Sequence, residues 1–344
     1  MNYGLIAIFD NDSEYANCLA DYFRIKGCIS SEIIVFTRIE SFKDFVNGHT
    51  LDILLINEQF MSDTDMALDY KFPKYNVFTL CENKFIAEDD TGIRLFKYTS
   101  AEEILREVMA GYKPTIPGVA IPFRDRHKSR IIGVYSPVNR CGKTSFTLAL
   151  ALHYSCKCSC LFISFDNYSS LGCLVEGSST AIKTIDDLLY YFSGSPELFD
   201  SKLLSTSRKI HQLDFILPSK QSCYICELDV SEQIQFLQRL QNTGQYDMIF
   251  VDIGTLAPVY PILQVCDKVY LPYIAGDTYS ESRLSKFMES IKSIDFQGTI
   301  SSQKISPPVI EFCSHDSDYI YSLTSGEMAH FIATLDDLFT SVKK

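Results

Sequence analysis

The residue types best suited to chemistry lie in a short turn, Gly142-Lys143-Thr144-Ser145, between an apolar strand-like run and a helical pattern within residues 131–152. A glycine lets backbone N–H groups approach a ligand closely, and the first turn of a helix attracts anions. Lys143 is expected to reach the β- and γ-phosphates of a nucleotide, and the Thr144 hydroxyl to bind Mg²⁺. The turn therefore predicts a phosphate site for ATP and magnesium.

The match to the consensus G-x-x-x-x-G-K-[ST] is incomplete, because Pro137 stands where the consensus has its first glycine. The loop K-G-G-x-G-K-[ST] of the ParA/MinD ATPases resembles this segment more closely, although Val138, Asn139 and Arg140 replace its Lys-Gly-Gly. Asn139 can adopt a left-handed backbone at modest cost, so a turn around phosphate remains feasible. The Arg140 guanidinium either contacts phosphate or points to solvent.

Two aspartates at predicted strand ends extend this site. Residues 245–254 form an apolar strand pattern that reaches Asp252 about a hundred residues after the loop, where an aspartate helps to hold the magnesium shell. Residues 160–166 predict another strand, with Asp166 at its carboxyl end. In the ParA/MinD family this strand ends in D-x-D, and the resemblance implies that Asp166 positions the attacking water. Each aspartate has a plainer alternative, which is to cap a helix or a turn.

The predicted site therefore has overlapping sets of residues. Lys143 and Asp166 are the predicted catalytic residues, and Thr144 and Asp252 are the predicted ligands of Mg²⁺. The residues predicted to hold ATP are Asn139, Arg140, Cys141, Gly142, Lys143, Thr144, Ser145 and Asp252.

Length and composition limit the classes of protein to which the chain can belong. With 344 residues it is expected to form about two domains, each with its own core. The net charge of −12 and a pI of about 5.0 disfavour diffuse attraction to DNA or acidic lipid. The amino terminus has no cationic stretch before its apolar run, and no run of apolar residues is long enough to span a bilayer. Neither export nor membrane spanning is predicted.

Cysteine use points to a reducing compartment. Twelve cysteines are scattered along a sequence without an export signal, so reduced thiols in a cytoplasm are expected rather than a disulfide framework. Cys156, Cys158 and Cys160 alternate into a strand, and Cys223 and Cys226 form a CxxC pair, so zinc is one interpretation of these clusters. The alternative is that they are small buried apolar side chains.

Prolines, a glycine and a basic run interrupt the regular periodicity at residues 113–130, which predicts a linker between domains at 1–112 and 131–344. The basic run either contacts nucleic acid or is a solvated connector. Its cationic residues are Arg124, Arg126, Lys128 and Arg130.

The first predicted domain alternates strand-like and helical runs. Five βα units predict a small doubly wound parallel sheet of the flavodoxin-like kind, whose ligands bind at the carboxyl ends of the strands. The strand-like runs are residues 5–9, 33–37, 53–56, 77–80 and 93–96.

Polar residues at those strand ends make this segment resemble a response-regulator receiver domain. A receiver has an acidic pocket for Mg²⁺, a phosphoryl-accepting aspartate after its third strand, a Ser or Thr after the fourth and a lysine after the fifth. Asp10, Thr79 and Lys97 occupy such positions, but Asn57 replaces the acceptor and Asn11 halves the acidic pair. Because an amide cannot form an acyl phosphate, we interpret the segment as a pseudo-receiver that packs or binds a partner. Lys97 and Asp10 would then remain as a buried or surface ion pair.

Residues 131–344 continue the alternation and predict a second doubly wound parallel sheet, so the expected fold class is α/β in both domains. A C-terminal helix is expected from residue 326, with an apolar face that extends to Val342. Its acidic polar face favours docking on its own domain over a MinD-like membrane contact. Further strands are expected at 215–218, 268–273 and 309–312, and a helix at 280–291.

A receiver-like domain, a Pro-rich basic linker and a ParA/MinD-like domain with an altered loop, in this order, resemble the TadZ/CpaE proteins of Tad (Flp) pilus loci. The resemblance rests on SPVNRCGKT, FDNYSSLG, YDMIFVDIG and the asparagine at position 57. It implies a cytoplasmic homodimer that binds ATP and recruits pilus or secretion assembly proteins to a cell pole or to membrane-associated pilus machinery. Val138 stands where the family loop has its first lysine, called the signature lysine, and the absence of this lysine implies slow hydrolysis of ATP or none. The alternatives are an active ParA/MinD-type ATPase that partitions DNA or positions a cell site, and a scaffold without nucleotide.

Overall fold

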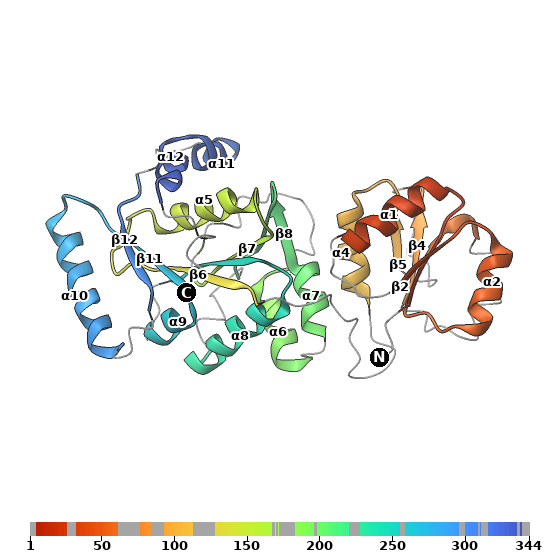
Figure 1. Cartoon of the computed structure of the whole chain (residues 1–344), viewed down its shortest axis with the longest axis horizontal. Coiled ribbons are helices and arrows are strands. Elements are labelled where there is room, and N and C mark those ends of the chain that lie inside the picture. Colours follow the sequence, from red (N-terminus) through yellow and green to blue (C-terminus); the bar gives the residue numbers. More distant parts are fainter. Residues whose placement is uncertain are drawn as a thin grey trace. The chain divides into compact units, whose positions relative to one another are not determined.

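Strands from the two halves of the sequence build two separate, mainly parallel sheets (Figure 1). The chain divides into two compact units, Met1–Asp125 with Tyr191–Ser205 and Arg126–Tyr190 with Thr206–Lys344. Residues 191–205 thus group with the first unit, which differs from the predicted boundary. The computed structural model describes residues 5–25, 32–60, 76–83, 93–112, 128–166, 169, 171, 183–195, 198–219, 228–254, 259–295, 300–308, 310, 316–335 and 338.

The first sheet consists of β1 Leu5–Phe9, β2 Glu32–Phe36, β3 Ile53–Asn57, β4 Val77–Cys81 and β5 Ile93–Phe96. Its strands are parallel and lie in the order β2-β1-β3-β4-β5, which is the flavodoxin-like order of doubly wound folds. Both β3 and β4 are buried along their whole length. Each strand-like run predicted for this half corresponds to one of these strands, and only Thr37 of the run 33–37 lies beyond its strand.

Helices cover both faces of the first sheet, which explains why its strands are continuous apolar runs. On one face α1 and α4 bury Phe23, Ile104 and Val108, and on the other α2 buries Phe42 and Val46. The helices described are α1 Ser13–Ile25, α2 Ile39–Gly48 and α4 Ala101–Gly111, with a 3₁₀ turn, η1, at Glu58–Phe60.

The second sheet consists of β6 Arg130–Val134, β7 Cys160–Ser164, β8 Ser207–Ile210, β9 Leu213–Ile216, β10 Met248–Asp252, β11 Lys268–Pro272 and β12 Ser302–Ile305. The strand order is β12-β11-β6-β10-β7-β9-β8. Neighbouring strands are parallel except for β8 and β9, which form an antiparallel pair at the edge. The central strands β7 and β10 are buried along their whole length.

The helices described in the second half are α5 Lys143–Ser155, α6 Ile185–Gly194, α7 Phe199–Thr206, α8 Val230–Thr243, α9 Tyr260–Val265, α10 Thr278–Ile294, α11 Asp316–Ser325 and α12 Glu327–Ala333. On one face of the second sheet α5 packs with α11 and α12, and α8 and α9 lie on the other (Figure 1). Because α5 carries apolar side chains around almost its whole circumference, it is buried between the sheet and the other helices of this face.

The second half differs from the expectations at two places. Strand β8 and its antiparallel pairing with β9 were not predicted, because the polar run Ser207–Ile210 has no long apolar pattern, whereas β9 overlaps the expected strand 215–218. The tight turn between the two strands is made possible by His211, whose φ is 53°. The last strand among the described residues is β12; of the predicted strand 309–312 only Ile310 is described, and it lies in no strand.

The predicted C-terminal helix is present but shorter than expected. It is α12, which begins at Glu327 directly after Gly326 and ends at Ala333, and Gly326 separates it from α11. A Cβ on Gly326 would lie 2.9 Å from the Ser322 carbonyl oxygen, so glycine fits this junction. The α12 residues Met328 and Ile332 are buried in the core of the second unit, so α12 docks on its own domain as expected. Phe339 and Val342 lie outside the described residues. In the part of the chain that is described, no helix combines the length and the apolarity needed to cross a bilayer.

Candidate functional site

The predicted phosphate turn lies at the carboxyl edge of the second sheet, beside the ends of neighbouring strands. The central strand β10 runs between β6 and β7, and Asp252 pairs in register with Val134 on one side and Ser164 on the other. The turn follows β6 and opens α5, so it leads directly past Asp252. Ligands of open α/β sheets bind outside this edge.

Left-handed backbone shapes the turn itself. Gly142 has a φ of 76° at the start of α5, and its carbonyl accepts a hydrogen bond from the Phe146 N–H at 2.8 Å. Arg140 has a φ of 59°, and its side chain is exposed. The left-handed residue of this loop is Arg140 rather than Asn139, for which that conformation was feasible, so the chain reverses one residue later, just before the buried Cys141. A non-glycine residue in this region is strained and persists only when its surroundings hold it.

Asp252 is fully buried, and each of its carboxylate oxygens has a partner from the turn. Lys143 Nζ forms an ion pair with Oδ1, and Thr144 Oγ1 donates to Oδ2 at 2.8 Å. Ser164 Oγ also donates to Oδ2, at 3.3 Å. A buried carboxylate without partners would be costly, so these donors are what permits a charge at the end of a central strand.

The chemistry of this donor set fits a magnesium-bound triphosphate. Hydroxyl and carboxylate oxygens are ligands that Mg²⁺ accepts, and Thr144 and Asp252 place both kinds side by side. The Lys143 side chain is 14% exposed and has a flexible stem, so its ammonium can leave Asp252 for a phosphate without unfolding α5. The structure thus brings together the predicted residues Lys143, Thr144 and Asp252.

The preceding part of the loop is anchored inside the unit. Ser136 Oγ donates to the Pro272 carbonyl at 2.6 Å and accepts from the Val138 N–H at 2.9 Å. Val138, which replaces the signature lysine, is itself buried. Cys141 Sγ donates to the Val138 carbonyl at 3.2 Å, so this thiol packs within the loop. Any contact of Cys141 with phosphate would come from its backbone.

The exits of β7 and β10 meet closely next to the turn. Asp166 is partly exposed, and its N–H donates to Ser164 Oγ at 3.3 Å. A Cβ on Gly254 would lie 2.2 Å from the Phe165 carbonyl oxygen and 3.1 Å from Asp166 Cα, so only glycine lets these two exits approach. Asp166 therefore lies at the same edge as the Lys143–Asp252 pair, and its role in positioning water stays a prediction.

Some residues of the site were not among those predicted. Ser164 has a signal in the sequence, because it stands at the first position of the D-x-D pattern. Gly254 follows the predicted Asp252 strand, but its close contact depends on the neighbouring strand. Tyr319 OH lies 2.8 Å from Ser145 Oγ and ties α11 to the first turn of α5. No local pattern could have indicated that last contact, since the two residues are 174 positions apart.

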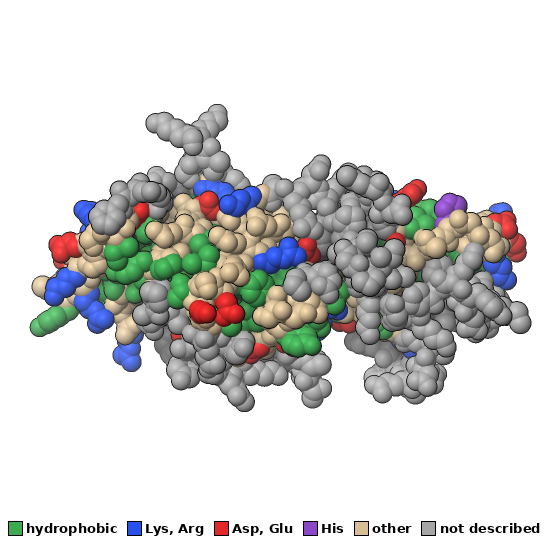
Figure 2. Space-filling view, turned by 90° about the horizontal axis from the view of Figure 1, so that it is seen from below, with side chains coloured by type: hydrophobic (Ala, Val, Ile, Leu, Met, Phe, Trp, Pro, Cys, Tyr) green, Lys and Arg blue, Asp and Glu red, His purple; other side chains and the backbone are tan. Residues whose placement is uncertain are grey.

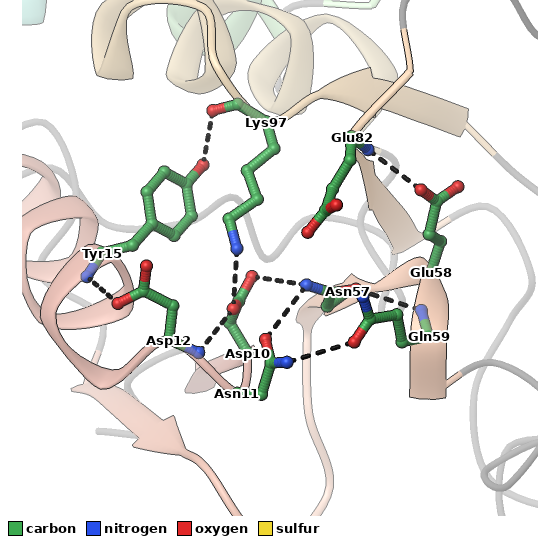
Figure 3. A network of polar contacts seen from close by, with 9 residues as sticks. All are labelled: Asp10, Asn11, Asp12, Tyr15, Asn57, Glu58, Gln59, Glu82 and Lys97. Atoms are coloured by element: carbon green, nitrogen blue, oxygen red, sulfur yellow. Dashed lines mark hydrogen bonds and ion pairs between the residues drawn. The ribbon is translucent and has the colours of Figure 1, made fainter.

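The first unit has a buried polar network at the carboxyl edge of its own sheet (Figure 3). Lys97 Nζ forms an ion pair with Asp10 Oδ1 at 2.9 Å, and the side chains are 3% and 0% exposed. Asn57 Nδ2 donates to Asp10 Oδ2 at 3.1 Å, while Asn57 Oδ1 accepts from the Gln59 N–H at 3.0 Å. The expected ion pair is therefore present, and it is buried.

Tyr15 closes the network on the side of α1. Its hydroxyl donates to the Lys97 carbonyl at 3.0 Å, and the Lys97 ammonium lies 4.6 Å from the centre of its ring. Burial, followed by the nearby charge of Asp10, raises the pKa of the Tyr15 hydroxyl above its ordinary value. The tyrosine is therefore neutral at physiological pH and serves as a donor.

This network already supplies the positive charge that an acidic pocket needs. The Lys97 ammonium neutralises Asp10, and the Asn57 amide fills the place beside it without adding charge. Every described side chain in this buried centre is hydrogen-bonded or ion-paired, and position 57 offers an amide rather than a carboxylate. Thr79 is buried at the same edge.

Other sequence features have no structural assignment. Cys223, Cys226 and residues 113–127 of the predicted linker lie outside the described residues. Within the described ranges, no group of three or more His, Cys, Asp or Glu side chains is arranged to hold a metal ion. Arg130 of the basic run donates to the Leu338 carbonyl, so this cation is used inside the second unit.

Comparisons with known proteins give similarity at the level of structure. No protein-family model matches the chain, and no curated protein matches it. The structure is similar to apo McdA of Cyanothece, with 15% identity, a TM-score of 0.40, and coverage of 57% of this chain and 81% of that chain. It is also similar to a ParA family ATPase from Chlorobium tepidum TLS, with 16% identity, a TM-score of 0.43, and coverage of 58% and 81%. A third similar structure is cobyrinic acid a,c-diamide synthase from Mycobacterium smegmatis with bound ADP and magnesium. Its sequence identity is 12% and its TM-score 0.39, and the match covers 57% of this chain and 81% of that chain.

Proposed function

We propose that the second unit binds ATP with Mg²⁺ as an atypical member of the ParA/MinD superfamily. The observation that carries this proposal is the convergence of Lys143 and Thr144 on the buried Asp252 carboxylate at the carboxyl edge of the central strands. A lysine, a hydroxyl and a carboxylate in this arrangement match the parts that hold phosphates and magnesium in P-loop proteins. When bound, Mg²⁺ would neutralise the phosphate charge, while Lys143 would orient the terminal phosphate.

We further propose that hydrolysis is weak or absent. Rapid phosphoryl transfer needs a cation at the transferring group, and the position of the signature lysine holds a buried valine, Val138. Arg140 is exposed within the loop, and it is our candidate for a replacement charge. Asp166 remains at the site edge as the proposed positioner of water.

The proposed biological role is that of a localisation and assembly factor for a Tad (Flp) type pilus or a related secretion apparatus, acting as a cytoplasmic homodimer. The buried Lys97–Asp10–Asn57 cluster supports the part of this proposal that concerns the first unit, because it favours a partner-binding pseudo-receiver over a phosphorylated one. A fluorescent fusion of the full chain in its native cell should form a focus at the pilus machinery. The focus should be lost in Lys143→Ala if ATP controls recruitment.

Single-turnover hydrolysis tests the chemical part of the proposal. With the full chain in excess over labelled ATP and Mg²⁺, we expect ATP to be retained on the protein and turned over no more than about tenfold faster than in Lys143→Ala. Fast hydrolysis that requires Lys143 would instead establish an active ATPase. If the protein does not retain ATP, the scaffold without nucleotide is the better description. The variant Arg140→Ala shows whether this arginine contributes to the retention of ATP.

A further inference from the structure

Two thiols meet in the bend that connects α5 to β7. Cys158 Sγ and Cys160 Sγ are 3.6 Å apart, with one S–H hydrogen-bonded to the other sulfur. Cys158 is half-buried at the surface, whereas Cys160 begins the buried strand and is 1% exposed. An accessible thiol thus lies against a protected one, which the function proposed above does not use.

The residue between the two cysteines is held firmly. Ser159 N–H and Oγ both donate to Asp247 Oδ2, at 2.9 and 2.7 Å, and the Asp247 N–H donates back to the Ser159 carbonyl at 2.9 Å. The Cys158 N–H donates to the Tyr154 carbonyl at 3.1 Å. These bonds fix the backbone on both sides of the thiols, so the sulfurs remain neighbours.

Exposure assigns different roles to the two sulfurs, because a disulfide from solvent reaches Cys158 and not the buried Cys160, and the electrostatics agree. The hydrogen bond between the two thiols lowers the pKa of the Cys158 thiol, and the charge of Lys157 acts in the same direction, against burial and the charge of Asp247. The hydrogen bond to Cys158, together with burial, raises the pKa of the Cys160 thiol. The thiolate is the nucleophile in thiol chemistry, so Cys158 is the attacking group and Cys160 is the second, resolving thiol.

We propose that Cys158 and Cys160 form a redox-active dithiol that exchanges with low-molecular-weight disulfides and closes to a Cys158–Cys160 disulfide. The Cys158 thiolate attacks one sulfur of RSSR, which forms a mixed disulfide and releases RS⁻. Cys160 then loses its proton to that thiolate and attacks Cys158 Sγ, which expels a second RS⁻ that takes up a proton from solvent. The protein loses two hydrogens and two electrons, and RSSR becomes two RSH.

The closure needs only a small movement. A disulfide bond is about 2.05 Å long, so the sulfurs must approach by roughly 1.5 Å from their present separation. The thiol pair lies at the carboxyl end of α5, whereas Lys143 and Thr144 lie at its amino end. This proposal therefore stands independently of nucleotide binding.

Oxidised glutathione is a suitable probe for the full-length native chain. Trypsin cleaves after Lys157 and separates Cys156 from the peptide 158–183, which contains Cys158, Cys160 and Cys173. After oxidation, denaturation and alkylation, we expect mass spectrometry to find this peptide lighter by two hydrogens, with Cys158 and Cys160 unalkylated. Fragmentation of the peptide should place the disulfide between these two residues. Dithiothreitol should restore alkylation of both residues.

Matched variants make the result decisive. Cys160→Ser should trap a stable glutathione adduct on Cys158, whereas Cys158→Ser should slow modification of Cys160 at least tenfold, and Cys156→Ser should leave closure unchanged. Cys18, an exposed cysteine of α1, serves as the reference for an ordinary surface thiol. The proposal is overturned if Cys158 in the wild type keeps its glutathione while Cys160 stays alkylatable, or if Cys158 pairs with another cysteine.

Discussion

A single buried carboxylate organises the candidate nucleotide site. Asp252 ends a central strand with no exposed surface and depends on Lys143, Thr144 and Ser164 for its hydrogen bonds and charge balance. Packing alone would favour an apolar residue at this position, because buried ion pairs contribute little net stability compared with well-packed apolar groups. A lysine, a hydroxyl and a carboxylate at this position are what the proposed nucleotide site requires.

Lys143→Ala should destabilise the free protein as well as weaken nucleotide binding. Removing one partner of a buried ion pair leaves an uncompensated charge, and we expect a loss of about 3 kcal/mol in the free energy of unfolding. Urea denaturation without nucleotide measures this loss. Lys286→Ala, which removes an exposed lysine of α10, is the matched control. Equal stability of the two variants would show that Lys143 and Asp252 are not paired in solution.

Asn57→Asp tests the polar network of the first unit. A carboxylate there would replace the amide that donates to Asp10 Oδ2 at 3.1 Å, so a hydrogen bond would become a repulsion between like charges. We expect the free energy of unfolding to fall by about 2 kcal/mol without Mg²⁺ and to recover in part when Mg²⁺ is added. Thermal melting without nucleotide measures both effects.

Asn11→Asp is the control for that experiment, because Asn11 is exposed at the rim of the same network. It should change the melting temperature less than Asn57→Asp. If the two variants melt alike, or if Mg²⁺ stabilises the wild type equally, the cluster is an open cation site and our description of it is wrong.

At the scale of elements, the strands near both candidate sites could be predicted because they are buried on both faces. Runs such as Ile53–Asn57 and Met248–Asp252 are apolar and bounded by polar residues, so their positions and the polar residues at their ends follow from the sequence. The phosphate turn could be placed for the same reason, since it joins a buried strand to a helix.

Features that depend on contacts between distant segments could not be predicted. The Ser207–Ile210 strand is polar at the sheet edge, and its pairing is visible only once the Leu213–Ile216 strand is in place. The left-handed Arg140 was missed because intrinsic preference favours asparagine, whereas the surrounding loop decides the conformation.

Gly254→Ala should push apart the strand exits that frame the nucleotide site. The added Cβ would meet the Phe165 carbonyl oxygen and Asp166 Cα, both of which are backbone and cannot rotate away. We expect a loss of about 2 kcal/mol in stability from this overpacking, together with weaker binding of ATP. Gly194→Ala is the control, because nothing lies within 4 Å of a Cβ at that position. Equal unfolding midpoints for the two variants would contradict the close approach of β7 and β10.

At the scale of the whole molecule, charge argues against a DNA-partitioning role. The net charge is −12, and on the face shown in Figure 2 the described lysine and arginine side chains lie scattered among acidic ones instead of forming a continuous basic stripe. Sequence-independent binding to DNA depends on lysine and arginine side chains that neutralise its phosphates. We expect no retardation of duplex DNA at physiological salt, with or without ATP and Mg²⁺. Retardation of the DNA that weakens with added salt would instead support the DNA-partitioning function.

The account depends most on the uptake of ATP by the second unit. Calorimetric titration of the full chain with ATP in the presence of Mg²⁺ tests this directly, with Lys143→Ala as the variant and Lys286→Ala as the control. We predict saturable binding of one ATP per chain, dependence on Mg²⁺, and at least tenfold weaker binding in Lys143→Ala alone. No heat of binding at millimolar ATP, or equal affinity in all three proteins, would contradict the proposed nucleotide site.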